Sequence, residues 1–216
     1  RDSSTSRGLG DVYKRQTEAH SRETMHHLWQ VMQATSQEYD PTQRSRSGLS
    51  GGDAAKVEQA HKEGKLLGGD YLSAVTAEAL KTAECNACMK RIVAAPTAGS
   101  CGVLPAVLLP LCRYEELSQH QLLEALYVAS GIGAVIAYRA CIAGASGGCQ
   151  AEIGTACSMA AAALAELYHQ NLDQVEYAAE VAMEHHLGLT CDPICGLVQI
   201  LSLIHISEPT RRRGIS

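Results

Sequence analysis

The sequence predicts an all-α protein, a compact bundle of roughly six to eight helices with glycine-rich loops that converge on one site. Three observations lead to this prediction. Apolar residues recur at helical spacing in long segments, almost no segment alternates apolar and polar residues as a strand would, and Gly- and Ser-rich stretches separate the helical segments. The chain is 46% apolar but has no Phe, one Trp and 19 Gly. We therefore expect helices that pack closely through small residues.

The helical pattern occupies residues 17–200, and we expect these residues to form one domain. Residues 1–16 and 201–216 show no useful period and are similar to translated sequencing-adapter read-through. We therefore treat both ends as non-native and the helical domain between them as truncated.

Composition argues against several classes of function. The net charge of −5 provides no basic surface for nucleic acid or for an anionic membrane. The uncharged stretch 125–138 has only 14 residues, whereas a membrane-spanning helix needs about 20. Nine cysteines in a chain that opens with no signal peptide indicate a reducing, cytoplasmic compartment, with thiols that are buried or hold a cofactor.

The first helix is expected over residues 17–37, with Leu28, Val31 and Met32 on one face. Residues 44–53 follow as a loop dense in Gly and Ser. The backbone amides of this loop can form a nest for a carboxylate or phosphate, or the loop can be a flexible turn. Asp53 resembles an N-cap for a helix that begins at Ala54.

A long helix is expected to start at residue 70 or 73 and to end at residue 89. Cys85 and Cys88 form a Cys-x-x-Cys pair inside it, and no second pair follows at the spacing of a zinc ribbon. We therefore expect both cysteines in the core. Asn86 lies between them at a position predicted to be buried, so its amide needs hydrogen-bond partners or has a functional role.

A second glycine-bearing loop spans residues 94–102 and leads into a helix over residues 103–111. Thr97 and Ser100 lie with the amides around Gly99 where this helix begins. Helix N-termini bind anions through free amide groups and the helix dipole. An anion site and an ordinary capped helix start both fit this pattern.

Residues 115–143 are expected to form one or two helices, with a candidate bend at residues 130–131. Arg139 is the only charge between Glu124 and Glu152. Because an isolated buried charge is very costly, we expect Arg139 to be paired or to face a cavity.

Helices over residues 150–170 and 172–187 complete the pattern, and Gly188 ends the second. Cys149 and Cys191 flank this helical hairpin, and each lies beside local breakers. Breakers place a side chain at the end of an element, where it can point into a cavity. The two thiols can bind a soft metal or an iron–sulfur cluster, or they can be small buried apolar residues.

Four loop segments, in this order, resemble the α subunit of bacterial iron–sulfur-dependent L-serine dehydratase. They are residues 47–53 (SGLSGGD), 94–102 (AAPTAGSCG), 144–154 (GASGGCQAEIG) and 188–193 (GLTCDP). The resemblance extends from residue 23 to Ile200, which is nearly all of the credible chain.

This resemblance implies a lyase that converts L-serine into pyruvate and ammonia by β-elimination, without pyridoxal phosphate. It implies a four-iron four-sulfur cluster held by three cysteines, of which Cys149 and Cys191 match two. One iron is then open and acts as a Lewis acid on the serine hydroxyl. The candidate substrate-binding residues are Ser47, Ser50, Gly51, Gly52, Asp53, Asn86, Thr97, Gly99 and Ser100.

The resemblance leaves the general base open. His185 and His186 precede the Cys191 loop and can act as the base or as partners that orient a cluster ligand. Glu152 is a further candidate base, or a salt-bridge partner of Arg139. Cys101 lies inside a matching motif, and we expect it to line the pocket.

One departure from the family pattern affects the cluster. The third cluster cysteine of the family comes in a Pro-Cys pair directly after the Val-Gln segment, but Leu201 and Ser202 stand there in this chain. A neutral hydroxyl is a poor substitute for a thiolate. We therefore expect that this polypeptide does not hold the cluster stably and is inactive as it stands.

The implied partners are L-serine and a β-type serine dehydratase subunit or domain, within a homo- or hetero-oligomer. The alternative hypothesis is a helical domain that binds zinc or a protein partner and performs no chemistry. Zinc bound through Cys85 and Cys88 would favour this alternative.

Overall fold

The computed structural model describes residues 17–188, 193–194 and 197–198, and it confirms the predicted all-α fold class. This part of the chain contains seven α-helices: α2 (Glu18–Gln37), α3 (Asp53–Lys62), α4 (Gly69–Ala87), α5 (Val103–Tyr114), α6 (Gln119–Arg139), α7 (Gly144–Leu167) and α8 (Leu172–Glu184). A 3-10 helix, η1 (Ala98–Ser100), precedes α5. The two-residue strands β1 (Pro193–Ile194) and β2 (Leu197–Val198) form an antiparallel pair.

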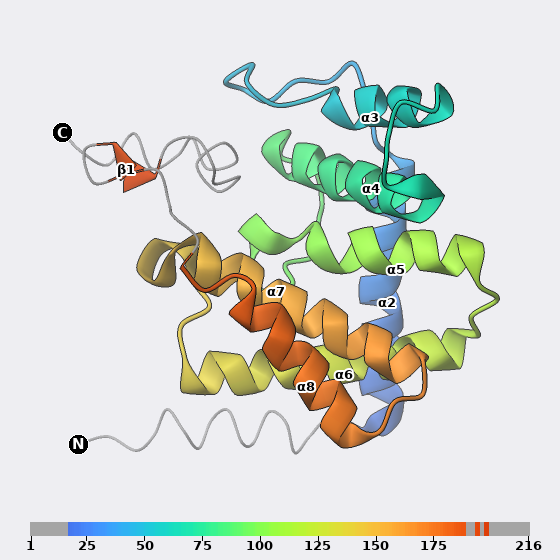
Figure 1. Cartoon of the computed structure of the whole chain (residues 1–216), viewed down its shortest axis with the longest axis vertical. Coiled ribbons are helices and arrows are strands. Elements are labelled where there is room, and N and C mark those ends of the chain that lie inside the picture. Colours follow the sequence, from blue (N-terminus) through green and yellow to red (C-terminus); the bar gives the residue numbers. More distant parts are fainter. Residues whose placement is uncertain (1–16, 189–192, 195–196, 199–216) are drawn as a thin grey trace.

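Helix α7 is the centre of the bundle (Figure 1). It packs against α5, α6 and α8 and also contacts η1. Helix α2 crosses behind α4, α5 and α6, and α3 covers α4 at one end of the molecule. The loop before α3, η1, the first turns of α7 and the C-terminal end of α8 all lie on the left of the view in Figure 1. The glycine-bearing loops therefore lie toward one side of the bundle.

Local sequence explains why several helices begin where they do. The Thr17 side chain accepts a hydrogen bond from the His20 amide at the N-cap of α2. Ser118 and Asn171 close capping boxes at the starts of α6 and α8. These contacts satisfy amides that have no partner in the first turn of a helix.

The structure corrects one predicted helix start and decides between the two alternatives for residues 115–143. The N-cap prediction for Asp53 is wrong: Gly52 is the N-cap, and Asp53 is the first residue of α3. Gly52 has a φ of 80°, a left-handed conformation that glycine adopts without strain. Helix α6 runs through residues 130–131 without interruption, so the segment 115–143 contains one helix and not two.

Helix α7 begins at Gly144, whereas the sequence predicted a helix from residue 150. Its first turn is separated from the rest by Gly148, whose φ of 73° and ψ of −179° are not helical. Cys149 is the first residue after this break. The local breaker that the sequence indicated is therefore present, although it lies inside a longer helical element.

The core is built mainly from leucine and small residues. Trp29, Leu108 and Leu126 are buried in its largest cluster, together with Met159 and several alanines. Helices α6 and α7 approach closely where Gly133 faces Met159: a Cβ atom on Gly133 would lie only 2.7 Å from the Met159 sulfur. The expected packing through small residues is thus observed at the central helix pair.

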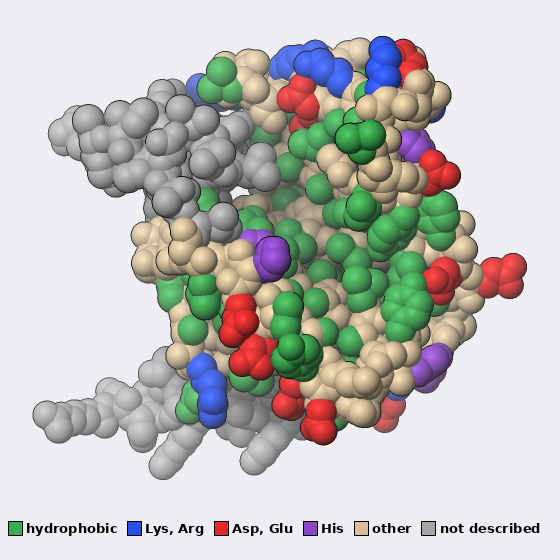
Figure 2. Space-filling model, in the orientation of Figure 1, with side chains coloured by type: hydrophobic (Ala, Val, Ile, Leu, Met, Phe, Trp, Pro, Cys, Tyr) green, Lys and Arg blue, Asp and Glu red, His purple; other side chains and the backbone are tan. Residues whose placement is uncertain are grey.

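Among the described helices, α6 is long and apolar enough to cross a membrane. A third of its most apolar 18-residue stretch is buried within the protein. Its N-terminal half contributes Leu122, Leu123 and Leu126 to the core. On the face drawn in Figure 2, most basic side chains lie at the end of the molecule formed by α3, another lies at the lower left, and they do not form a continuous stripe.

Glu78 connects three helices from a position that is 1% exposed. Its carboxylate accepts hydrogen bonds from Ser36 on α2 at 2.5 Å and from Arg113 on α5 at 2.7 Å. The Lys81 ammonium lies 3.3 Å away. Burial raises the pKa of Glu78, but the two hydrogen bonds and the positive charges outweigh burial, so the pKa lies below its ordinary value.

A depressed carboxylate pKa contributes stability that is present at neutral pH and is lost as the pH falls through the folded-state pKa. We expect Glu78→Gln to lower the free energy of unfolding at pH 7 by about 1–3 kcal/mol. Because glutamine does not titrate, the variant should also lose less stability below pH 4.5 than the parent chain. Urea denaturation at a series of pH values measures both effects. If the free energies of unfolding of the two proteins fall in parallel as the pH is lowered, this assignment is contradicted.

Candidate active site

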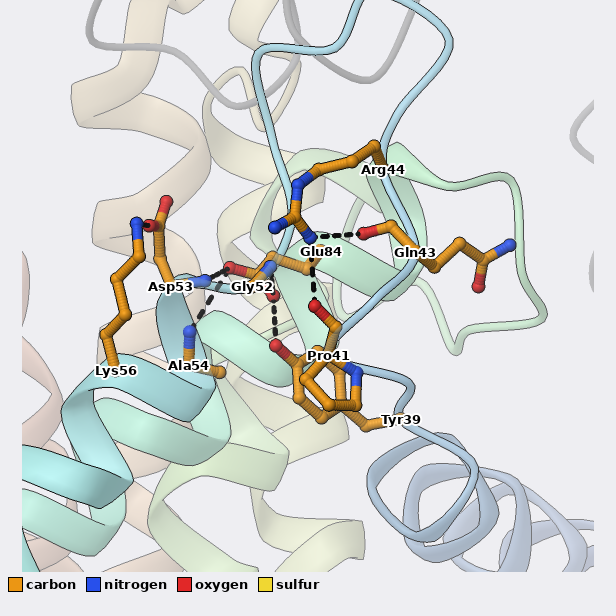
Figure 3. A network of polar contacts seen from close by, with 9 residues as sticks. All are labelled: Tyr39, Pro41, Gln43, Arg44, Gly52, Asp53, Ala54, Lys56 and Glu84. Carbon is orange, nitrogen blue, oxygen red and sulfur yellow. Dashed lines mark hydrogen bonds and ion pairs between the residues drawn. The ribbon is translucent and has the colours of Figure 1, made fainter.

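The first glycine-bearing loop ends in three backbone amides that bind a carboxylate of the protein itself (Figure 3). The amides of Gly52, Asp53 and Ala54 donate to the Glu84 carboxylate at 2.9, 2.6 and 3.2 Å. The Tyr39 hydroxyl donates to the same carboxylate at 2.6 Å. The anion nest that the sequence suggested is therefore formed, and the described structure places Glu84 in it.

Glycine is required at two positions of this nest. Gly51 has a φ of 131°, and a Cβ atom there would lie 2.3 Å from the Gln43 carbonyl oxygen. A Cβ atom on Gly52 would lie 2.8 Å from the Arg44 guanidinium. Burial of Tyr39 raises the pKa of its hydroxyl, and the adjacent Glu84 carboxylate raises it further, so Tyr39 remains a hydrogen-bond donor.

The predicted substrate-binding side chains of this loop point to different surroundings. Ser47 is exposed and its hydroxyl lies 3.1 Å from the hydroxyl of Ser45, whereas Ser50 is buried. The Asp53 carboxylate is exposed and pairs with Lys56 at 2.7 Å. Of these three side chains, Ser47 and Asp53 are exposed and Ser50 is buried.

The second loop is held in place by α4. Thr97 and Ser100 form a capping box around η1, and their hydroxyl oxygens lie 3.1 Å apart. Asn86, near the end of α4, donates from its side-chain amide to the Ala98 carbonyl at 2.9 Å. Asn86 is half-buried, and the Ala98 carbonyl is the hydrogen-bond partner that we expected its side-chain amide to need. Glu84 and Asn86, two residues apart near the end of α4, thus bind the first and second loops.

A hydrogen bond joins the second loop to the Cys149 helix. The Thr97 hydroxyl donates to the carboxylate of Glu152, which is 3% exposed and lies less than one turn after Cys149 on α7. Sequence reasoning considered Glu152 as a base or as a partner of Arg139 and did not foresee its contact with Thr97. Arg139 is exposed and lines a cavity at the end of α6. This is one of the two environments that the sequence predicted for it.

A second contact brings Gly188, just after α8, to the start of α7. The Gly188 amide donates at 3.0 Å to the side-chain oxygen of Gln150, the residue next to Cys149. Cys191 itself lies outside the described residues, as does Ser202. Cys191 is three residues after Gly188 in the sequence, and three residues of extended chain span at most about 11 Å. Cys149 is half-buried at this junction.

A cavity of about 470 Å³ adjoins this junction, lined by the end of α6, the start of α7 and the end of α8. Cys141, which sequence reasoning did not single out, is exposed on its wall. The Cys141 sulfur lies 2.8 Å from the Ser146 hydroxyl, and this hydrogen bond lowers the pKa of the thiol below its ordinary value. Cys141 lies outside the four matching segments, whereas Ser146 lies within the segment 144–154.

The two candidate bases differ in their surroundings. His185 is exposed at the end of α8, whereas His186 is half-buried and packs over Gly154 of α7. The Nδ1 atom of His186 lies 2.8 Å from the Ala182 carbonyl oxygen. Because a carbonyl oxygen only accepts, Nδ1 carries the proton and Nε2 is left with a free lone pair.

The remaining cysteines fit core or lining positions. Cys85 is 2% exposed and points its thiol toward the Thr35 carbonyl at 3.6 Å, while Cys88 is half-buried at the end of α4. Cys101 is buried, and desolvation raises the pKa of its thiol to about 12. Within the described residues, no group of three or more His, Cys, Asp or Glu side chains is arranged to hold a metal ion.

Comparison with known proteins identifies the family of this chain. Residues 5–201 match the family model of the serine dehydratase alpha chain. The chain is 40% identical over 176 residues to a Bacillus subtilis protein named "Probable L-serine dehydratase, alpha chain", covering 82% of this chain and 59% of the relative. It is 44% identical over 148 residues to the L-serine dehydratase alpha chain of Peptoniphilus asaccharolyticus, covering 68% and 51%.

The same similarity extends to L-serine dehydratase 1 of Escherichia coli, at 41% identity over 183 residues, covering 81% of this chain and 40% of the relative. The chain thus spans between two fifths and three fifths of the length of these relatives. The family match begins at residue 5, inside the segment 1–16 that we expect to be non-native. It ends at residue 201, the first residue of the C-terminal segment that we also expect to be non-native. The chain belongs to the serine dehydratase alpha chain family.

Proposed function

We propose that the fold of this chain serves the β-elimination of L-serine to pyruvate and ammonia. The observation that carries the proposal is the hydrogen bond from Thr97 to Glu152, because it joins the loop at 94–102 to the helix that presents Cys149. The contact between Gln150 and Gly188 adds the segment that leads to Cys191. Relatives named as L-serine dehydratases supply the substrate and reaction class.

The proposed cofactor is a four-iron four-sulfur cluster, with Cys149 and Cys191 as two of its ligands. Cys149 follows the break at Gly148 and is half-buried, which suits a ligand at the wall of a pocket. The donor set of this chain falls one thiolate short, since Ser202 stands at the third position. We therefore propose that the polypeptide as it stands neither keeps the cluster nor turns over serine.

When bound, the cluster supplies a Lewis acid for the departing hydroxyl of serine. The protein's own residues must hold the substrate carboxylate and accept the Cα proton. Three amides of the first loop already bind Glu84, so we assign the carboxylate to the second loop around Thr97, Gly99 and Ser100.

We assign the base to His186 before His185. The Ala182 carbonyl fixes the Nδ1 proton of His186, so that Nε2 can accept a proton, and Gly154 leaves room for the ring beside α7. Loss of the Cα proton and of the β-hydroxide, which together amount to one water molecule, gives the aminoacrylate. The aminoacrylate tautomerises to an imine, and a water molecule hydrolyses the imine to pyruvate and ammonia.

The alpha-chain names of the relatives also support a multi-subunit enzyme. We propose a β-type subunit or domain as the partner of this fold, and a cytoplasmic location for the parent enzyme. Both proposals rest on the family and not on a surface of the described residues.

The test is anaerobic reconstitution of the Leu201→Pro, Ser202→Cys double variant with iron and sulfide. We expect the parent chain to retain little iron and the double variant to retain about four iron ions per chain. The loaded variant should produce pyruvate from L-serine, and exposure to oxygen should abolish this activity. Adding Cys149→Ser to the double variant is the control and should remove both iron and activity. A fully loaded variant that forms no pyruvate would contradict the proposed function.

A further inference from the structure

The C-terminal half of α6 carries an exposed apolar ridge, formed by Gly131, Ala134, Val135 and Tyr138. These residues follow one another at helical spacing and therefore share one face. Val135 is 56% exposed and Tyr138 is 91% exposed. No charged residue occurs in the sequence between Glu124 and Arg139. The opposite side of the same helix packs against α7.

An apolar hollow lies on each side of this ridge. One has a volume of about 290 Å³ and lies between α6, the middle of α2 and the segment 93–96, with Leu28 and Ala137 on its walls. The other is the cavity of about 470 Å³ between α6, α7 and α8, with Ile136 and Leu187 on its walls. A ridge of small and apolar side chains between two grooves is the surface against which another helix packs in ridges-into-grooves fashion.

The length of the related alpha chains points to what covers this surface. The chain covers 59% and 51% of two relatives that are alpha chains only, so a large part of each relative has no counterpart in the match. Helix α8 ends at Glu184, and Leu187, three residues later, lies on the wall of the larger hollow, with Gly188 bonded to Gln150 beside it.

We propose that the ridge and its two hollows receive an apolar helix from the part of the alpha-chain fold that lies outside the region shared with this chain. A membrane is disfavoured as the occupant because the other side of α6 holds Leu122, Leu126 and Ala129 in the core. Removing α6 from the bundle would expose the alanine-rich face of α7. The proposal rests on family membership and is independent of the proposed reaction.

The experiment uses this chain and, as the probe, the polypeptide of the Bacillus subtilis relative that lies outside the 176 matched residues. We expect a one-to-one complex by isothermal titration calorimetry, with slower hydrogen exchange in residues 130–139. Val135→Asp should weaken binding by at least about tenfold, because it places a carboxylate in an apolar interface. Leu67→Asp is the matched control: Leu67 is fully exposed on the segment between α3 and α4, and its replacement should leave binding unchanged.

Circular dichroism should show that both variants remain folded, since both positions are exposed. Absence of binding, or equal binding by the Val135→Asp variant, would overturn the proposal. Concentration-dependent dimerisation that protects residues 130–139 would overturn it in favour of a second copy. Co-sedimentation of the free chain with phosphatidylcholine vesicles, abolished by Val135→Asp, would overturn it in favour of a lipid surface. None of these outcomes depends on cluster loading or on serine turnover.

Discussion

Glu84→Ala will lower the free energy of unfolding by about 3–5 kcal/mol, the largest stability effect we expect from a single substitution outside the apolar core. Glu84 is 4% exposed and accepts hydrogen bonds from three amides and from Tyr39. Alanine leaves these four donors without an acceptor at the start of α3. For a domain of this size the change corresponds to a fall of about 10 °C in Tm, which differential scanning calorimetry measures.

The control for Glu84→Ala is Glu176→Ala, which removes an exposed carboxylate from α8. Surface substitutions of this kind change stability by no more than about 0.5 kcal/mol. The loss of unfolding free energy caused by Glu84→Gln should lie between the losses of the two alanine variants, because the amide oxygen can accept some of the four hydrogen bonds. If Glu84→Ala and Glu176→Ala destabilise the chain equally, the nest does not hold the first loop.

Glu152→Ala will release the second loop from α7. Without the carboxylate, Thr97 loses its acceptor across the site, and the amides of residues 97–101 should exchange with solvent on the order of 10–100 times faster. In the Leu201→Pro, Ser202→Cys background, misplacement of the loop should lower kcat/KM for L-serine about 100-fold. Hydrogen-exchange mass spectrometry and a pyruvate assay measure the two effects.

Glu152→Gln separates positioning from proton transfer. The glutamine oxygen can still accept the hydrogen bond from Thr97, so a residue that only positions the loop should be rescued to within about tenfold of the parent activity. An amide cannot accept the Cα proton, so a full loss of activity with normal loop protection would identify Glu152 as the base and contradict the assignment to His186. Thr97→Val should reproduce the loop release of Glu152→Ala.

Helix content was predictable because apolar spacing and caps are local properties of the sequence. Ser118 and Asn171 sit where capping boxes begin α6 and α8. Boundaries at glycine were less predictable: Gly52 is an N-cap and Gly148 interrupts α7, and their conformations depend on contacts with distant parts of the chain.

The site was predictable as a set of loops but not as a set of contacts. The motifs indicated Thr97 and Cys149, yet the sequence contains no signal that Glu152 accepts a hydrogen bond from Thr97 or that Glu84 fills the nest at Gly52. Each of these pairs joins residues more than 30 positions apart, so local patterns carry no information about them. Packing of α4 and α7 against the loops decides both contacts.

Residue-resolved alkylation of the reconstituted Leu201→Pro, Ser202→Cys variant tests most directly whether Cys149 and the segment after Gly188 belong to one metal centre. Our account predicts that iron and sulfide slow the alkylation of Cys149 and Cys191 together, while half-buried Cys88 reacts as it does without metal. Cys149 reacting equally fast with and without iron and sulfide, or protection of Cys88 in its place, would contradict it.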